Sequence, residues 1–458
     1  MDGLITLLGV LAWGTWIVRV GLVVAQMYQI EEYEWPRLLG WGHKRSWLFP
    51  TAVLAGSLLA LGSGMLASLT SVAGALGLLV GAAVMHILWR RTPAKKPLIY
   101  TPRMRRMLGA SLTLLVLFGL IVAALLHTAS PPLAVVLATF LCLSSMELAL
   151  WLIITGDKAM APVEAAIQRG FVRQAKARVQ DYRPRTVGIA GSYGKTSTKH
   201  ILAQLTAPQI ETLPTPKSFN TLMGITRTIN EHLESTHRLF LVEMDAYDVG
   251  EIRAMSELVA PELAVITSVG PQHLERFGTV ERIGDALYEL VEALPAGKPA
   301  VIYAGEPESA RLAERAAAAG YEVVRYGLGG ESSQPLDIVA TAVTVDERAT
   351  HFTWRWPARG KEARVSIPLL GQHNILNVSA ALAIVELLGL SVDKAVQEAA
   401  RLEAVPHRLQ LLPSPGGVTV IDDSYNANPV GVHNGLEVLA QMRGKAKILV
   451  TPGLVELG

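Results

Sequence analysis

Apolar residues are concentrated in the first third of the chain. Five stretches of about 20 largely uncharged residues have the length that a hydrocarbon core of roughly 30 Å requires, and they are residues 4–26, 47–66, 69–89, 107–127 and 131–154. The first stretch lacks the basic start and the cleavage site of a signal peptide. Residues 1–155 are therefore predicted to form a multi-spanning α-helical membrane domain.

The loops between these stretches predict their orientation. Residues 90–106 carry seven basic side chains and no acidic one, as cytoplasmic loops tend to do. Five spans would then place the amino terminus outside the cell and everything after residue 155 in the cytoplasm.

Two charged residues lie inside the predicted spans. Arg19 and Glu147 each lie seven residues before the cytoplasmic end of their stretch, which is about 10 Å deep in a helix. They could pair with each other inside the membrane. Alternatively, Arg19 reaches the interface with its long side chain and Glu147 faces a neighbouring helix.

Residues 156–185 predict a basic amphipathic linker helix. Val163, Ile167 and Phe171 recur at helical spacing. The other side of this helix carries basic residues, namely Arg169, Arg173, Lys176 and Arg178. Such a helix could lie on an anionic leaflet, or it could be a solvated linker that packs on the following domain.

A phosphate-binding loop is predicted directly after this linker. Residues 186–190 read as a β-strand and residues 197–205 as a helix. Glycines in such a loop let backbone N–H groups approach phosphate oxygens, and the start of the helix adds positive potential. The expected nucleotide-binding residues are Gly191, Ser192, Gly194, Lys195, Thr196 and Ser197. Lys195 would supply a charge, and Thr196 would place its hydroxyl on Mg²⁺.

Further short apolar runs alternate with helical stretches in this part of the chain. They cover residues 239–244, 262–269, 300–304 and 322–326. This alternation predicts an α/β domain with a mainly parallel sheet and with ligand chemistry at the carboxyl ends of its strands. Glu243 and His273 fall at such ends, and a carboxylate and an imidazole beside a phosphate loop suit a metal site.

Composition narrows the class of protein. The 458 residues carry a net charge of +2, with 17% charged side chains and one cysteine. These values argue against a disordered chain and against a disulfide scaffold. They also give no overall basic field that would favour a nucleic acid as partner.

The motifs of residues 186–458 resemble those of the Mur ligases, most closely the D-alanyl-D-alanine-adding type. The matching segments are GIAGSYGKTSTK (188–199), FNTLMG (219–224), VEMDAYDVGEI (242–252), TSVGPQHLERFG (267–278), PLLGQHNILN (368–377), VPHRL (405–409) and IDDSYNANP (421–429). The resemblance implies ATP and Mg²⁺ as cofactors. It also implies that ATP phosphorylates a carboxylate and that an amine then attacks the acyl phosphate.

The resemblance also implies roles for single residues. Asn220 matches an asparagine near the γ-phosphate, and Glu243 and His273 match metal ligands together with Thr196. Asn374 and Asn377 match nucleotide-contacting asparagines, although they could also cap a helix that begins near residue 374. Catalytic roles fall to Lys195, His273, Arg408 and Asp423, the last two being brought to the nucleotide by the final domain.

The resemblance implies two domains in the second part of the chain. The chain also departs from the family pattern in three ways. Residues 186–402 would be the central ATP-binding domain, and residues 403–458 an incomplete Rossmann-like domain that includes a strand at 447–451. A membrane domain stands in place of the uridine-nucleotide-binding domain, and the chain is expected to be a fragment or to receive its last domain from elsewhere. Leu287 replaces a metal-binding lysine, and Asp285 or Glu289 could supply an anion instead.

We therefore expect a membrane-bound, ATP-dependent amide ligase of peptidoglycan precursor synthesis, in the bacterial inner membrane with the ligase part cytoplasmic. Its expected partners are membrane lipids, a UDP-linked or lipid-linked muramoyl peptide, and D-Ala-D-Ala or another amino donor. Three alternatives remain: a ligase like the poly-γ-glutamate synthetases, a nucleotide-binding scaffold with weak catalysis, and an ATP-driven transporter.

Overall fold

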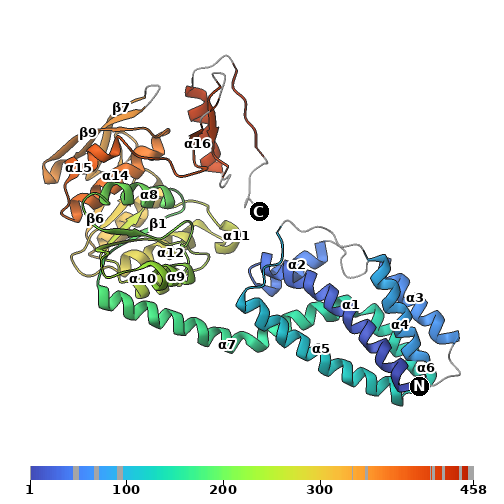
Figure 1. The fold of residues 1–458 in the computed structure, drawn as a ribbon. Coiled ribbons are helices and arrows are strands. Elements are labelled where there is room, and N and C mark those ends of the chain that lie inside the picture. Colours follow the sequence, from blue (N-terminus) through green and yellow to red (C-terminus); the bar gives the residue numbers. More distant parts are fainter. Residues whose placement is uncertain are drawn as a thin grey trace. The chain divides into compact units, whose positions relative to one another are not determined.

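The computed structural model forms two compact units, residues 1–167 and residues 168–458 (Figure 1). It describes residues 2–44, 51–66, 72–89, 96–332, 334–345, 349–412, 414, 418–424, 429–442 and 446–451.

The first unit is helical. Its helices are α1 (Asp2–Ile30), α2 (Trp35–Lys44), α3 (Thr51–Leu66), α4 (Ala73–Leu88), α5 (Pro102–Thr128), α6 (Pro131–Leu143) and the first part of α7 (Ser145–Tyr182). In the described residues, α1 and α5 are each long and apolar enough to cross a membrane, and α6 and α7 pass the same test together but bend by 65° at their junction. Residues 51–66 and 73–88 form shorter apolar helices, and the remaining ends of those two predicted spans lie largely outside the described residues.

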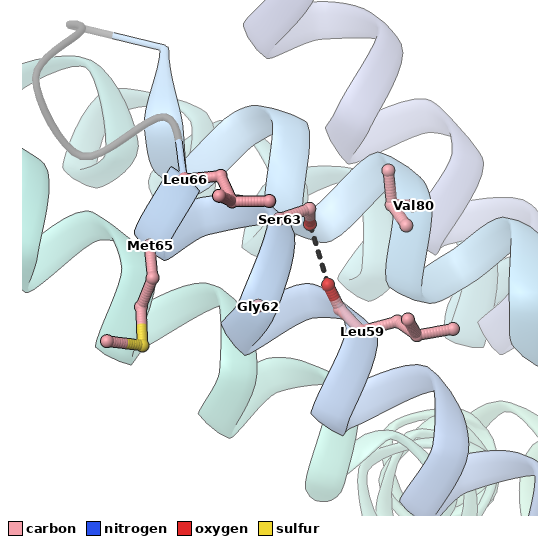
Figure 2. A pocket seen from close by; sticks show the side chains of 6 residues that line it. All are labelled: Leu59, Gly62, Ser63, Met65, Leu66 and Val80. Atoms are coloured by element: carbon pink, nitrogen blue, oxygen red, sulfur yellow. Dashed lines mark hydrogen bonds between the residues drawn. The ribbon is translucent and has the colours of Figure 1, made fainter.

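Small residues allow the helices of this unit to approach closely. A Cβ at Gly77 of α4 would lie 2.7 Å from the carbonyl oxygen of Ala60 in α3. Such contacts hold apolar helices together through backbone proximity. Beside them lies a shallow apolar hollow of about 580 Å³ (Figure 2). Its lining is formed by Leu59, Gly62, Ser63, Met65, Leu66 and Val80.

Gly77→Ala should destabilise this unit. The added methyl group must push α3 and α4 apart, and overpacking of this kind costs about 1–3 kcal/mol. Gly62→Ala is the matched control, because a Cβ there meets nothing within 4 Å. Thermal unfolding of the full chain in detergent should show a lower midpoint for Gly77→Ala alone. Equal midpoints for the two variants would contradict the tight α3–α4 contact.

Of the two possibilities for Arg19 and Glu147, the ion pair is wrong. The guanidinium of Arg19 instead donates hydrogen bonds to the carbonyl oxygens of His86, at 2.6 Å, and Trp89, at 3.2 Å. These carbonyls belong to the end of α4, where a helix leaves its last C=O groups without partners inside the helix. Arg19 is therefore held by backbone oxygens rather than by a carboxylate.

The predicted linker is helical. It is the second part of α7, which continues without a break from the last apolar segment. In its second half, Ala175 and Val179 are buried in a core that contains Ile225 and Ile229. Arg178 also donates to the carbonyl oxygen of Asn230 at 2.8 Å. The end of this helix thus packs on the following domain, which agrees with the second of the two sequence interpretations.

The second unit is built on a nine-stranded sheet in the order β2-β3-β1-β4-β5-β6-β7-β8-β9. The strands are β1 (Arg185–Ala190), β2 (Thr212–Pro214), β3 (Leu239–Glu243), β4 (Leu263–Ile266), β5 (Ala300–Tyr303), β6 (Val323–Leu328), β7 (Ile338–Val345), β8 (Thr350–Trp356) and β9 (Lys361–Ile367). The pairs from β2 to β7 are parallel, and β8 and β9 add an antiparallel extension. The predicted mainly parallel sheet is confirmed.

Helices cover both faces of this sheet (Figure 1). One face packs against α8 (Lys195–Thr206), α14 (Gln372–Leu387) and α15 (Val392–Ala399). The other face packs against α9 (Leu222–His232), α10 (Glu251–Val259), α12 (Val280–Glu292) and α13 (Pro307–Ala318). All residues of β3 are buried. Because a strand buried on both sides needs a continuous apolar run, this explains the four apolar residues that precede Glu243.

Several predicted boundaries differ from the structure. The strand predicted at 262–269 ends at Ile266, because Thr267 and Ser268 leave the sheet to hold the loop after β1. The remaining elements are α11 (Leu274–Phe277), β10 (Gln410–Leu412), β11 (Val420–Asp422), α16 (Pro429–Gln441) and a 3-10 turn at Pro357–Arg359. Residues 447–451 do not form the predicted strand, and Ile448 and Val450 are strongly exposed.

Candidate functional site

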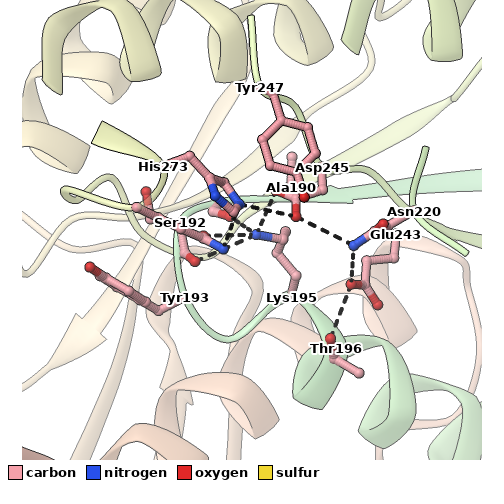
Figure 3. Close-up of polar contacts among 12 residues, drawn as sticks. Ala190, Ser192, Tyr193, Lys195, Thr196, Asn220, Glu243, Asp245, Tyr247 and His273 are labelled. Carbon is pink, nitrogen blue, oxygen red and sulfur yellow. Dashed lines mark hydrogen bonds and ion pairs between the residues drawn. The ribbon is translucent and has the colours of Figure 1, made fainter. Parts of the chain in front are cut away.

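The candidate site lies at the carboxyl ends of three neighbouring strands. Because β1 lies between β3 and β4, the loop that follows β1 runs between the segments that follow the other two strands. The loop of residues 191–194, Glu243 at the end of β3, and His273 beyond β4 therefore come together (Figure 3). This edge is where open parallel sheets bind ligands.

Two glycines give the loop its shape. Gly191 has φ +140° and Gly194 has φ +84°, conformations that L side chains rarely adopt. A Cβ at Gly191 would lie 2.2 Å from Oγ1 of Thr267, and a Cβ at Gly194 would lie 2.8 Å from Oδ1 of Asn377. Any side chain at these two positions would meet Thr267 or Asn377. Glycine therefore lets the loop pack closely while the amino end of α8 stays open to a phosphate.

The segment after β4 holds the loop in place. The backbone N–H of Ser192 donates to the carbonyl oxygen of Ser268 at 3.0 Å, and the N–H of Tyr193 donates to Oγ of Ser268 at 2.8 Å. Oγ of Ser192 donates to the carbonyl oxygen of Gly270 at 2.9 Å. These bonds fix the loop from one side, while Ser197 lies in the first turn of α8.

Lys195 is buried at the centre of the site and pairs with Asp245, with 3.1 Å between Nζ and Oδ1. Its ammonium also donates to the carbonyl oxygen of Gly191 and to Oε1 of Gln272. Burial alone would raise the pKa of Asp245, but the charges of Lys195 and His273 outweigh it and hold that pKa well below its usual range. Asp245 therefore stays ionised as the counter-charge of the lysine.

Glu243 accepts hydrogen bonds from two side chains and forms an ion pair with a third. Oγ1 of Thr196 and Nδ2 of Asn220 lie 3.0 Å and 3.1 Å from its Oε1, and Nζ of Lys199 lies 2.8 Å from its Oε2. Lys199 and Glu243 are both buried. The carboxylate thus lies beside the phosphate loop in a fixed orientation.

The three predicted metal ligands are only partly brought together. Thr196 and Glu243 are in contact, whereas Nε2 of His273 lies 3.6 Å from Oδ2 of Asp245. In the described part of the chain, no three His, Cys, Asp or Glu side chains are grouped as they would be to hold a metal ion. Magnesium in nucleotide sites takes one or two protein oxygens together with phosphate oxygens and water, and the oxygens of Thr196 and Glu243 fit that use.

The two asparagines of α14 lie beside the start of α8, next to the loop. Oδ1 of Asn377 accepts from Oγ1 of Thr198 at 3.1 Å. Nδ2 of Asn377 donates to Oδ1 of Asn374, whose own Nδ2 donates to the carbonyl oxygen of Leu370 at 2.7 Å. The helix already begins at Gln372, so both asparagines lie within it. The alternative in which they cap the helix is wrong.

His373, between these asparagines and Gly371, should make stability depend on pH. Burial lowers the pKa of His373 from 6.5 to about 4. Between these two pH values the ring is neutral in the folded state and charged in the unfolded state. Protonation therefore favours unfolding, so the free energy of unfolding is highest above pH 6.5 and decreases as the pH falls toward 4. The thermal midpoint of the wild type should fall more steeply over this interval than that of His373→Gln, which cannot titrate. Equal slopes would contradict this assignment.

Arg408 and Asp423 lie near each other beside the β10–β11 pair. Oδ1 of Asp423 accepts from the backbone N–H of Leu409 at 3.1 Å. Burial raises the pKa of Asp423, and the charge of Arg408 opposes that rise. Residues 425–428 of the same motif lie outside the described residues. The predicted role of both side chains at the nucleotide stays a prediction.

An apolar wall closes one side of the site. Leu287 is buried and lines a small cleft together with Gly191, Asp245 and His273. The idea that Asp285 or Glu289 supplies an anion there is wrong. Asp285 pairs with Arg315 at an exposed position. Glu289 accepts from the backbone N–H groups of Gly250 and Arg253 at the start of α10.

Sequence reasoning missed several residues of the site. Asp245 follows Glu243 by two positions, and side chains two apart in an extended segment point to the same side, so this signal was present. Lys199 lies one helical turn after Lys195 and carried a similar signal. Tyr247, whose ring centre lies 4.4 Å from that of His273, is recognised only from the structure.

Comparisons with known proteins agree with this geometry. Residues 189–385 match the Mur ligase middle domain. The UDP-N-acetylmuramoyl-tripeptide–D-alanyl-D-alanine ligase of Mycobacterium tuberculosis is 38% identical over 259 residues, which are 56% of this chain and 48% of the relative. The enzyme of that name from Bacillus subtilis is 30% identical over 285 residues, which are 62% and 59%. The chain thus spans about half to three-fifths of the length of these relatives.

Solved structures give the same result. MurF from Acinetobacter baumannii superposes with a TM-score of 0.55 at 26% identity, covering 60% of this chain and 59% of its own. The MurF ligase from Thermotoga maritima in complex with ADP has the same TM-score and identity and covers 61% and 62%. The chain therefore carries a Mur ligase middle domain and is there a homologue of the D-alanyl-D-alanine-adding ligases.

Proposed function

We propose that this chain is an ATP-dependent, ADP-forming amide ligase of peptidoglycan precursor synthesis. The observation that carries the proposal is the position of buried Lys195 in a glycine loop between the ends of β3 and β4. That loop belongs to the segment that matches the Mur ligase middle domain. Clustered positive charge and N–H groups at such a loop suit phosphoryl transfer to a carboxylate.

The residues of the site divide the task of holding a nucleotide. The N–H groups of residues 194–197 at the start of α8 would bind phosphate oxygens, with Lys195 as the cation among them. Glu243 and Thr196 would offer oxygens to Mg²⁺, and Asn220 keeps Glu243 oriented toward the loop. ATP, when bound, supplies the phosphoryl group that activates the carboxylate of the substrate. His273 and Asp245 both line the cleft, and His273 can orient the carboxylate of Asp245.

The substrates we propose are a muramoyl tripeptide and D-Ala-D-Ala, as the names of the relatives indicate. The muramoyl peptide could be linked to UDP or to a lipid. The apolar helices α1 and α5 favour the lipid-linked form, because an enzyme held at a membrane meets lipid-linked substrates at its surface.

We also propose that the first unit lies in the bacterial inner membrane, crosses it more than once, and leaves the ligase part in the cytoplasm. Many large apolar side chains are exposed on this unit, and we call the following set the apolar belt. It includes Leu7, Leu11 and Val18 of α1, Leu117, Leu120 and Ile121 of α5, and Val136 and Phe140 of α6. Exposed apolar side chains on long apolar helices support contact with the hydrocarbon of a membrane.

One observation favours a second candidate function. Because Leu287 makes one wall of the cleft apolar, the chain could bind nucleotide and organise other envelope enzymes while catalysing weakly. The two functions differ in their products, so one experiment separates them.

The test uses the full chain in detergent with ATP and Mg²⁺. Phosphate release and amide product should both depend on a muramoyl tripeptide, offered as the UDP-linked form and then as the lipid-linked form, together with D-Ala-D-Ala. Phosphate release that ignores the acceptor and gives no amide would favour the scaffold and contradict ligation. Nucleotide binding without any turnover would do the same.

A further inference from the structure

Arg19 lacks an acidic partner in the first unit. The acidic residues of this unit are Asp2, Glu31, Glu32, Glu34, Glu147, Asp157 and Glu164. Arg37 pairs with Glu31 and Glu32, Arg103 with Asp157, and Arg106 with Glu164. Within the described residues no carboxylate forms an ion pair with Arg19, and the undescribed stretches of this unit contain no Asp or Glu.

The surroundings of Arg19 offset only part of its charge. Its two terminal nitrogens donate to the carbonyl oxygens of His86 and Trp89, and the guanidinium lies 5.3 Å from the ring centre of Trp89. The carboxyl end of a helix carries roughly half a negative charge. A guanidinium has five N–H donors, so donors and positive charge both remain for a further acceptor.

His86 fixes the plane of this guanidinium. Nδ1 of His86 lies 3.4 Å from Nη1 of Arg19, and Nε2 of His86 lies 3.3 Å from Oγ1 of Thr15. Because arginine can only donate, Nδ1 must accept, and the ring proton is then on Nε2 and faces Thr15. The ring therefore restricts the orientation of the guanidinium, and this also restricts the directions of its remaining N–H donors.

The group lies at the border of the apolar belt. Leu11 and Val18 of the belt precede Arg19 on α1, and Leu88 is exposed at the end of α4. Thr15 is exposed, and Arg19 is only partly buried. The guanidinium is thus accessible beside exposed apolar side chains, where a lipid can present an anion next to its acyl chains.

We propose that Arg19, oriented by His86, binds the phosphate group of a lipid whose chains lie along the apolar belt. The inference rests on the membrane position proposed above for the first unit. A planar guanidinium matches the oxygens of a phosphate with two parallel hydrogen bonds. A lipid phosphate also neutralises a cation that would otherwise be costly at the edge of a hydrocarbon layer. The phosphate could belong to a phospholipid headgroup or to a polyprenyl phosphate.

The experiment measures lipid adducts on the delipidated full chain by native mass spectrometry in an uncharged detergent. The probes are dioleoylphosphatidylglycerol, undecaprenyl phosphate, dioleoylglycerol, which has acyl chains but no phosphate, and inorganic phosphate as a competitor. The wild type should retain one phosphate-bearing lipid and no dioleoylglycerol. Preference for the first or second probe identifies the headgroup or the polyprenyl carrier as the source.

Variants separate the site from general charge effects. Arg19→Gln should weaken the adduct about tenfold or more, the effect of losing hydrogen bonds to a charged group. Arg19→Lys should lie in between, because it keeps the charge and loses the fork. Arg105→Gln removes an exposed arginine of α5 and should leave the adduct unchanged.

The proposal is overturned if Arg19→Gln binds the lipid as the wild type does, if dioleoylglycerol binds equally, or if inorganic phosphate competes but no lipid adduct forms. Its failure differs from failure of the ligase proposal. Lys195→Ala should retain the lipid adduct, and Arg19→Gln should retain ATP turnover with the soluble UDP-linked substrate. Circular dichroism of each variant reports whether the helices remain folded.

Discussion

Lys195→Ala should lower substrate-dependent ATP turnover by roughly two to three orders of magnitude, the loss seen when one preorganised charge is removed from a developing anion. Lys195 is the buried cation of the loop, and its ammonium is held 3.1 Å from Asp245. The measurement is phosphate release with the UDP-linked tripeptide and D-Ala-D-Ala. Lys394→Ala, an exposed lysine on α15, is the matched control and should keep full activity.

Removal of Lys195 also leaves the carboxylate of Asp245 without its main partner, so a loss of folding must be distinguished from a loss of chemistry. The double variant Lys195→Met with Asp245→Asn removes both charges together. Its thermal midpoint should return toward that of the wild type while turnover stays low. Turnover of Lys195→Ala within a few-fold of the wild type would mean that this loop does not bind the reacting phosphates.

Glu243→Gln should lower both stability and turnover. The change leaves the buried ammonium of Lys199 without its carboxylate, and breaking a buried pair in this way costs about 3 kcal/mol or more. The thermal midpoint of the full chain should then fall by roughly 5 °C. Turnover should also require more Mg²⁺, because an oxygen ligand beside Thr196 has lost its charge.

A double-mutant cycle separates the two roles of Glu243. Lys199→Met combined with Glu243→Gln removes the unpaired charge and should recover most of the stability. Its need for Mg²⁺ should remain as high as that of Glu243→Gln alone. If the double variant also recovers the normal Mg²⁺ dependence, Glu243 supports the fold only and takes no part in holding the metal.

The part of the site that can be predicted from the sequence is the part formed by residues that are neighbours in the chain. The segment from Thr186 to Ser197 predicts a strand, a loop and a helix, and all three are formed, although α8 begins at Lys195 rather than at 197. Glu243 was expected at a strand end and is found there. Its contacts with Lys199 and Asn220 depend on the order of strands in the sheet, which hydrophobic patterns do not give.

The first unit shows the limit of hydrophobic patterns more clearly. Residue spacing placed Arg19 and Glu147 at similar depth, but depth along a helix says nothing about the direction in which a side chain points. The break between α6 and α7, with its bend of 65°, changes that direction just before Glu147. No glycine or proline marks the break at Ser144, and the two adjacent serines there do not interrupt the hydrophobic pattern, so that pattern does not predict the bend.

The order of strands in the second unit has a further consequence for solubility. An unpaired edge of a sheet can join the edge of another molecule and start aggregation. One edge here is β2, which has only three residues and ends at Pro214, whose nitrogen has no hydrogen to donate. The other edge is β9, which carries Lys361, Glu362 and Arg364. Both borders of the sheet thus discourage strand addition, so this unit is protected from edge-to-edge polymerisation at high concentration.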